Sequence, residues 1–291
     1  MSPDTARHAG DTATPADAPA VAAPPAPPAG PLVVGETADG VRRLVLNDAR
    51  RRNPLSEAML LALSDALRAA AADEAVHAVV LAAEGPAFSA GHDLKELTAH
   101  RADPDRGRRF FDYTMRTCAD LMTQIVRLPK PVIAEVEGIA TAAGCQLVAS
   151  CDLAIAGAGA RFATPGVSIG LFCSTPMVAL SRNVSRKHAM HMLLTGDMVD
   201  AERARDIGLV NEVVPAGESR AAAHALASRI AARSPLTLKI GKEAFYRQLE
   251  YDLDEAYAYA AEVMVENMMA RDAEEGIGAF IEKREPTWER R

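Results

Sequence analysis

The stretch Ile139–Leu153, IATAAGCQLVASCDL, decides the fold expected for this chain of 291 residues. It follows the apolar run PVIAEVEG at Pro131–Gly138, which is typical of a buried strand. The small residues Ala142, Ala143 and Gly144 indicate that a helix begins directly after that strand. The first turn of a helix leaves backbone N–H groups unpaired at the positive end of the helix dipole. The stretch therefore predicts a place where an oxygen that becomes negative during a reaction is stabilised.

On either side of this stretch, short β-like runs alternate with helical ones. The runs LVVGET and VRRLVLN, separated by an Asp39-Gly40 pair, predict a hairpin. Ser56 is expected to cap a helix, and Arg106–Arg127 to form a longer one. Further strands are expected at His77–Ala83 and in the segments PVIAEVE, DLAIAGA and LVNEVVP. The recurrence of two strands and a helix predicts stacked β-β-α turns rather than an antiparallel sandwich.

Three parts of the chain differ in composition. Residues 1–30 are rich in Ala and Pro and are expected to form a disordered tail, whereas residues 31–215 carry the strand and helix pattern. Residues 216–291 read as helix throughout. One helix there has a largely apolar face that is too wide to leave in water, so this face either packs on the core or meets another subunit, and the second is favoured. That face consists of Tyr257, Ala260, Ala261, Met264, Val265, Met268 and Met269.

The composition excludes several classes of function. Hydrophobic residues make up 49% of the chain and charged residues 24%, as in an ordinary globular protein. The formal net charge of −7 disfavours a nucleic-acid partner, and no apolar run is long enough to cross a membrane. The four cysteines show no CxxC pairing, which favours free thiols in a reducing cytoplasm. A transit peptide is the alternative for the tail, but Asp4, Asp11 and Asp17 disfavour it. His188 and His191 lack a third ligand, so no metal site is expected.

Four blocks of sequence resemble the crotonase superfamily of enoyl-CoA hydratases and isomerases. They are FSAGHDLKEL (Phe88–Leu97), ATAAGCQLVASCDLAIA (Ala140–Ala156), FATPGVSIGLF (Phe162–Phe172) and RDAEEGIGAFIEKREPTW (Arg271–Trp288). The blocks occur in the family's order, and the resemblance covers about Leu32 to Trp288. Within the family, the subgroup of enoyl-CoA hydratase domain-containing protein 3 is the most similar. The resemblance implies an α/β fold with a crotonase (ClpP-like) β-β-α spiral core and a C-terminal α-helical trimerisation region.

The resemblance also implies a ligand and the residues that bind it. The family binds acyl-CoA or enoyl-CoA thioesters, needs no cofactor other than the coenzyme A of the substrate, and assembles as homotrimers or homohexamers. The two backbone N–H groups that hold the thioester oxygen correspond to those of His92 and Ala143. The positions that correspond to the acyl-CoA site are Arg50, Arg51, Arg52, Ala90, Asp93, Leu94, Lys95, Phe172, Cys173, Ser174 and Lys283, the last reaching a neighbouring subunit's coenzyme A.

The sequence departs from the family at the two glutamates that handle the proton and the water in hydratases. These positions correspond to Gln146 and Gly166, neither of which can transfer a proton. General acid–base groups typically contribute about 10²–10⁴ in rate. We therefore expect hydration of enoyl-CoA to be very slow. Two hypotheses remain: an enzyme of acyl-CoA and fatty-acid metabolism with a different or weak activity, and a non-catalytic acyl-CoA binder or regulatory subunit.

Other side chains near these positions have two interpretations each. Cys145 is either a thiol activated by the helix dipole or a small buried residue, and the second is favoured. The segment Cys173-Ser174-Thr175 either supplies hydroxyls that order a water or provides a helix N-cap at Ser174 or Thr175, and the cap is favoured. His92 acts either through an imidazole that titrates near neutral pH or through its backbone amide, and the amide is favoured. Asp93 is expected to clamp its loop rather than act as a base.

Overall fold

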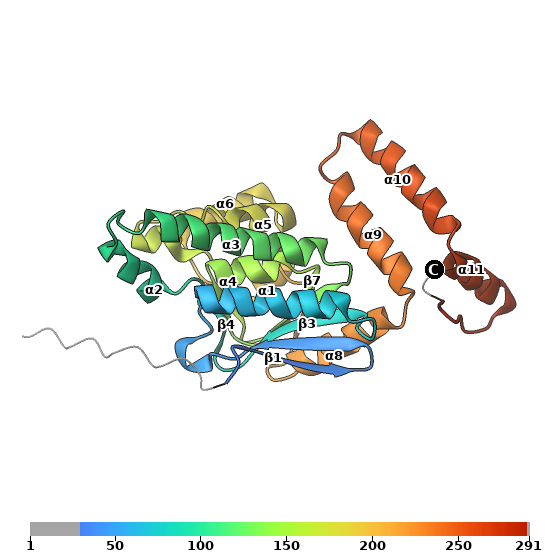
Figure 1. Cartoon of the computed structure of the whole chain (residues 1–291), viewed down its shortest axis with the longest axis horizontal. Helices are drawn as coiled ribbons and strands as arrows, with labels where there is room; N and C mark the ends of the chain where they lie inside the picture. Colours follow the sequence, from blue (N-terminus) through green and yellow to red (C-terminus); the bar gives the residue numbers. More distant parts are fainter. Residues whose placement is uncertain (1–29, 290–291) are drawn as a thin grey trace, which may run out of the picture.

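Two β-sheets form the centre of the protein in a computed structural model that describes residues 30–289 (Figure 1). The larger sheet has the strand order β1-β2-β3-β5-β7-β10, and the smaller has the order β4-β6-β8-β9. The β1–β2 and β8–β9 pairs are antiparallel and all the others are parallel. The strands are β1 Val33–Ala38, β2 Val41–Leu46, β3 Ala78–Ala83, β4 Ala87–Ser89, β5 Val132–Val136, β6 Ile139–Thr141, β7 Leu153–Gly157, β8 Arg161–Ala163, β9 Val199–Asp200 and β10 Glu212–Val214.

Successive turns of the chain give one strand to each sheet and then a helix. This is the predicted β-β-α pattern, with β3 and β4, β5 and β6, and β7 and β8 as the strand pairs. The α-helices are α1 Glu57–Ala72, α2 Leu94–Ala99, α3 Arg108–Arg127, α4 Ala143–Ser150, α5 Pro176–Asn183, α6 Arg186–Thr195, α7 Ala201–Asp206, α8 Ser219–Ala231, α9 Pro235–Gln248, α10 Leu253–Met268 and α11 Arg271–Glu282; the 3-10 helices are η1 Ala49–Arg51, η2 His100–Ala102 and η3 Pro165–Ile169.

Local sequence signals explain the first elements. Asp39 and Gly40 both have positive φ, of 51° and 75°, which is the turn geometry that joins β1 to β2 with the correct twist. The Ser56 hydroxyl accepts a hydrogen bond from the Met59 N–H at 3.3 Å and so caps α1. The apolar stripe of α1 is fully buried, as its spacing predicts. The predicted hairpin and helix cap are therefore confirmed.

The larger sheet is covered on both faces. One face packs into the main core with α1, α3 and α4. The other face is covered by α8, whose Ala223, Ala227 and Ala231 contact Val80 and Ile133 of the sheet in a second buried cluster. Small side chains let the helix approach the sheet closely. Helix α8, which we grouped with the C-terminal helices from its sequence, therefore packs as part of the core.

The helices that stand apart from the core are α9, α10 and α11 (Figure 1). Helix α9 is attached through Lys242, whose ammonium group donates to the carbonyl oxygens of Ile125 and Lys130, both at 3.0 Å. The same ammonium group lies 2.7 Å from the Asp152 carboxylate, which also accepts from the Tyr246 hydroxyl at 2.8 Å. Helices α9, α10 and α11 form an arm. These polar contacts join its first helix, α9, to the end of α3 and the start of β7.

The apolar face predicted on α10 is exposed in the single chain. Tyr257 is 72% exposed and Met269 81%, and on α11 Phe280 is 84% exposed. The face does not pack on the chain's own core. No helix in residues 30–289 is long and apolar enough to cross a membrane. The predicted tail, residues 1–30, lies outside the described residues except for Gly30.

Candidate functional site

The start of α4 lies where the sequence predicted that a helix begins, and its backbone is unusual. Ala142, the residue before the helix, has φ 51° and ψ −119°, a conformation that costs a non-glycine residue of order 1–3 kcal/mol. Its N–H donates to the Ala163 carbonyl oxygen of β8 at 2.9 Å. Ala143 then begins the helix, so its N–H belongs to the first turn, whose N–H groups have no acceptor within the helix. The Ala142 conformation thus sets the direction of the Ala143 N–H.

A second loop, Ser89–His92, packs tightly against this helix start. A Cβ at Gly144 would collide with the Ser89 carbonyl oxygen, and one at Gly91 would lie 3.2 Å from the Ala143 nitrogen. Gly91 also has φ 87°, which favours glycine. These two glycines therefore allow the loop to reach the first turn of α4.

The backbone N–H of His92 is left unused by the contact that holds this loop. Leu55 and His92 form an isolated parallel bridge, in which the Leu55 N–H donates to the Gly91 carbonyl oxygen at 2.8 Å. In a parallel bridge of this kind, the backbone groups of Leu55 bond to the residues on either side of His92 and not to His92 itself. The His92 N–H therefore points away from Leu55. The N–H groups of His92 and Ala143 thus lie on two segments in direct contact.

The imidazole of His92 is held against the same neighbour. Its Nδ1 lies 3.2 Å from the Leu55 carbonyl oxygen, and because a carbonyl oxygen only accepts, Nδ1 carries the proton. Burial lowers the pKa of His92 below its ordinary value of 6.5, opposed in part by this hydrogen bond. The ring is therefore neutral at pH 7. Its Nε2 is buried and has no hydrogen-bond partner among residues 30–289.

Asp93 clamps its loop, as predicted. Its Oδ1 accepts from the N–H groups of Lys95 and Glu96 at 3.0 and 3.2 Å and so caps α2, and its Oδ2 lies 3.1 Å from the Arg51 guanidinium. Arg51 also pairs with the buried Asp48 at 2.5 Å. The Arg51 guanidinium thus already forms ion pairs with two carboxylates, which argues against the interpretation of this residue as a phosphate ligand.

Except for the buried Cys173, the remaining predicted ligands of coenzyme A lie at the surface. Arg50 and Arg52 are exposed, as are Lys95 and Leu94 on α2 and Ala90 before it. Phe172 is 42% exposed, and Ser174, also exposed, is near the start of α5. Lys283 is exposed at the end of α11, on the arm. The structure brings Ala90 and Lys95 to the His92 loop, whereas Lys283 lies on a different part of the chain.

The two positions that lack glutamates differ in their surroundings. Gln146 lies in α4 and is only 4% exposed, and its amide oxygen has no hydrogen-bond partner in the described part of the chain. A Cβ at Gly166 would lie 2.8 Å from the Cys173 sulfur and 2.8 Å from the Leu171 carbonyl oxygen. The Gly166 N–H donates to that same sulfur at 3.3 Å. The segment Leu171–Cys173 therefore fills the space that a side chain at residue 166 would need.

The structure bears on the two interpretations given to Cys145 and to the hydroxyls before α5. Burial raises the pKa of Cys145 to about 12, with a smaller contribution from the nearby Cys173, so Cys145 is a neutral thiol at pH 7. The interpretation of Cys145 as a small buried residue is therefore favoured. Thr175 precedes α5 without a side-chain cap, and the Ser174 hydroxyl donates to the Phe172 carbonyl oxygen at 3.3 Å. Neither the Ser174 nor the Thr175 side chain therefore forms the predicted N-cap of α5.

No motif or spacing in the sequence pointed to Thr164. It follows β8, is 1% exposed, and its hydroxyl has no hydrogen-bond partner within residues 30–289. Because Thr141 pairs with Ala163 in the smaller sheet, Thr164 lies beside the start of α4. Only the strand pairing reveals this neighbourhood, since the two segments are separated by 20 residues of sequence.

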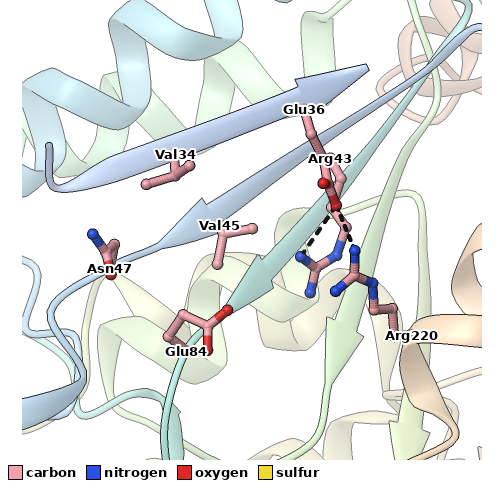
Figure 2. A pocket seen from close by; sticks show the side chains of 7 residues that line it. All are labelled: Val34, Glu36, Arg43, Val45, Asn47, Glu84 and Arg220. Carbon is pink, nitrogen blue, oxygen red and sulfur yellow. Dashed lines mark hydrogen bonds and ion pairs between the residues drawn. The ribbon is translucent and has the colours of Figure 1, made fainter. Parts of the chain in front are cut away.

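A pocket of about 480 Å³ lies elsewhere, on the larger sheet beside β1 (Figure 2). Figure 2 shows the Glu36 carboxylate paired with Arg220 at 2.7 Å and with Arg43 at 3.7 Å. Arg43 also makes a bidentate contact with the buried Glu135. None of the predicted site residues lines this pocket. In the part of the chain that the structure describes, no group of three or more His, Cys, Asp or Glu is placed to hold a metal ion.

Comparisons with known proteins agree with the fold and the blocks of sequence. The Enoyl-CoA hydratase/isomerase family matches residues 36–291. The chain is 47% identical to enoyl-CoA hydratase domain-containing protein 3, mitochondrial, of Rattus norvegicus, over 90% of this chain and 87% of that protein. It resembles the crystal structure of an enoyl-CoA hydratase of Mycobacterium smegmatis, with 52% identity, a TM-score of 0.84, and coverage of 89% of this chain and 99% of the other. The crystal structure of human enoyl-CoA hydratase domain-containing protein 3 matches with 46% identity, a TM-score of 0.84, and coverage of 88% and 100%. The chain therefore belongs to the enoyl-CoA hydratase/isomerase family and has the crotonase fold.

Proposed function

We propose that this protein binds acyl-CoA thioesters at the start of α4, with the thioester oxygen between the backbone N–H groups of His92 and Ala143. The observation that carries the proposal is the close packing of the Ser89–His92 loop on α4, which Gly91 and Gly144 make possible. Donors of this kind are worth about 2.7–4 kcal/mol each to a developing oxyanion in other enzymes. The coenzyme A is part of the ligand, and no separate cofactor is proposed.

The proposed activity towards enoyl-CoA is weak. Gln146 cannot transfer a proton near neutral pH, and the packing around Gly166 leaves no room for a side chain there. The two N–H groups polarise the thioester carbonyl, but the water that would add to the double bond has no base at either position. The protein thus acts as a slow or different catalyst within the family's chemistry. The second candidate, a non-catalytic binder of acyl-CoA, is favoured by these same two positions.

Coenzyme A is proposed to lie along the exposed guanidinium groups of Arg50 and Arg52, with Lys95 nearby. Arginine suits phosphate because its N–H groups form paired hydrogen bonds. Lys283 is proposed to reach the coenzyme A of a neighbouring subunit. The location proposed for this protein is the cytoplasm, whereas the name of the rat relative places that protein in mitochondria.

Self-association into a trimer or hexamer is proposed from the apolar face of the arm. The large side chains Leu253, Tyr257, Met264 and Phe280 are each 60% exposed or more in the single chain. A surface of this kind is too apolar to remain in water and marks an interface. Light scattering after size exclusion would give the mass of a trimer or hexamer, and a monomeric mass would contradict this part of the proposal.

Two measurements test the proposed function. A thermal-shift panel of CoA thioesters is expected to raise the melting temperature, because a ligand that binds only the folded state stabilises it. Following the loss of enoyl absorbance with crotonyl-CoA is expected to give very slow hydration. If no thioester stabilises the protein, the binding proposal fails. If crotonyl-CoA is hydrated at the rate of an ordinary hydratase, the argument from Gln146 and Gly166 fails.

A further inference from the structure

The larger sheet ends in an edge strand whose outer side is open. Strand β1 is the first in the order of that sheet and pairs only with β2 within residues 30–289 (Figure 1). An edge of this kind is a template for pairing with another strand, and proteins protect such edges with Pro, Lys, a bulge or a covering segment. Strand β1 has the sequence VVGETA, residues 34–38 are exposed, and its register with β2 is unbroken from Val33 to Ala38. None of the usual protections within the strand is therefore present.

The hydrogen bonds between β1 and β2 decide which backbone groups of β1 face outward. The Asn47 N–H donates to the Leu32 carbonyl oxygen at 2.8 Å, and these two residues lie opposite each other, one position before the first pair of the register. Hydrogen-bonded and non-hydrogen-bonded positions alternate along an antiparallel pair. Every second residue of β1 therefore turns its N–H and C=O groups to the outer side, and these residues are Val33, Gly35 and Thr37. No other backbone segment in residues 30–289 forms a hydrogen bond with these groups.

The outward groups of β1 are symmetric about Gly35. Pro31 is the next outward position before Val33, but a proline has no N–H to donate. At the other end the strand turns at Asp39, whose φ is 51°. Two copies of β1 can therefore bond all of these outward groups to each other in only one antiparallel register. In that register Gly35 lies opposite Gly35 of the second copy.

The uncharged side chains of β1 match in the same register. Val33 comes to lie opposite Thr37 of the second copy, and pairs of β-branched side chains stabilise a sheet. The two Gly35 residues at the centre add no side chain that would hold the strands apart. A strand with a bulky residue at its centre would fit this edge less closely than β1 itself.

The charged side chains of β1 also permit this pairing. Glu36 lies opposite Val34 of the second copy, so like charges do not face each other directly, and the two Glu36 side chains are diagonal neighbours about 7–8 Å apart. Each Glu36 carboxylate is 2.7 Å from the Arg220 guanidinium of its own chain, as Figure 2 shows. Each copy thus brings a balanced pair of charges to the contact.

We infer that β1 pairs antiparallel with β1 of a second copy of this chain, about a twofold axis at Gly35, so that the two larger sheets become one continuous sheet. Two copies related by a twofold axis contribute the same patch to their contact, which is the arrangement that a self-complementary strand allows. The contact lies on β1 and not on the arm, so it is separate from the self-association proposed for α10 and α11 (Figure 1). It is also independent of the proposed thioester site at the start of α4.

Cross-linking of the full chain tests the register. Opposite residues of a hydrogen-bonded antiparallel pair have Cα atoms about 5.5 Å apart, which a disulfide spans. The variant Gly35→Cys, whose new Cβ meets nothing closer than 3.4 Å, is expected to form a covalent dimer when it is oxidised with copper phenanthroline. Thr37→Cys is the matched control, because its two copies lie four residues apart along the ladder, or about 14 Å. The four native cysteines are buried and do not form this cross-link.

Light scattering after size exclusion tests the contact without a cross-link. Gly35→Pro removes the central outward N–H but no hydrogen bond to β2, and is expected to halve the mass of the assembly, whether or not the arm assembles. Gly35→Ala keeps the N–H and is expected to keep the mass. On the unmodified protein, dilution below the dissociation constant of the contact is expected to increase hydrogen exchange at the Gly35 amide, so the test does not depend on the folding of a variant.

A cross-link in Gly35→Cys that is absent from Thr37→Cys, together with the halved mass of Gly35→Pro, supports the inference. The inference is overturned if Gly35→Cys forms no covalent dimer, or if Gly35→Pro has the mass of the unmodified protein. An edge occupied by residues 1–29 of the same chain would give that second set of results. Thioester binding measured on the same variants bears on the proposed function alone, and its absence leaves the β1 contact standing.

Discussion

Restoring the two missing carboxylates should not restore hydration, because only one of the two positions can hold a side chain. In Gln146→Glu combined with Gly166→Glu, the new Cβ at residue 166 meets the Cys173 sulfur and the Leu171 carbonyl oxygen, both at 2.8 Å. Real Cβ atoms do not approach other atoms so closely, and one of the two obstacles is backbone. The Leu171–Cys173 segment must therefore move.

The expected cost follows from this contact. Overpacking of a well-packed site costs typically about 1–3 kcal/mol, and each kcal/mol lowers the melting temperature of a domain of 150–250 residues by about 2–4 °C. We thus expect the double variant to melt about 2–12 °C below the unmodified protein. Its hydration of crotonyl-CoA should remain within tenfold of the starting rate, although a working acid–base pair would contribute about 10²–10⁴ per group.

The assay is the loss of enoyl absorbance, with thermal melting measured on the same samples. Gly159→Glu is the matched control, since nothing lies within 4 Å of a Cβ there and the melting temperature should not change. A double variant that melts normally and hydrates crotonyl-CoA a hundredfold faster would refute the steric reasoning.

Three further predictions concern stability. Lys242→Met removes one partner of a largely buried ion pair and leaves the Asp152 carboxylate without its cation. This should cost up to about 3–5 kcal/mol, the range for a fully buried pair, and increase hydrogen exchange in α9. Unchanged exchange would contradict the anchoring role. The pKa of His92 is lowered in the folded protein, so the unfolded chain binds more protons below about pH 6.5 and stability should fall on acidification. His92→Asn should flatten this slope in denaturant titrations between pH 7 and 5, whereas the exposed His191→Asn should not. Ala142→Gly relieves a strained φ of 51° and should raise the melting temperature; a lower one would contradict the strain.

Local signals in the sequence predicted much of the fold. The Asp39-Gly40 turn, the Ser56 cap and the helix start at Ala143 each depend on a few neighbouring residues, and each is confirmed. Periodicity also separated the exposed face of α10 from a core helix. The β-β-α order followed from these elements because short connections leave few alternative topologies.

Contacts between distant segments could not be predicted in this way. From the sequence alone, Arg51 is interpreted as an exposed basic residue. In the structure it forms ion pairs with Asp48 and with Asp93, which lies 42 residues later. Helix α8 has no bulky apolar stripe, and only the packed structure shows that its alanines cover the sheet. Likewise, Gly166 reads as a simple loss of a carboxylate, and the structure adds that Cys173 occupies the space.

A crystal structure with butyryl-CoA bound tests the central claim most directly. The account predicts the thioester oxygen about 2.7–3.1 Å from the backbone nitrogens of both His92 and Ala143. A thioester oxygen bound away from these two nitrogens, or an acidic side chain directed at the α- and β-carbons of the acyl chain, would contradict it.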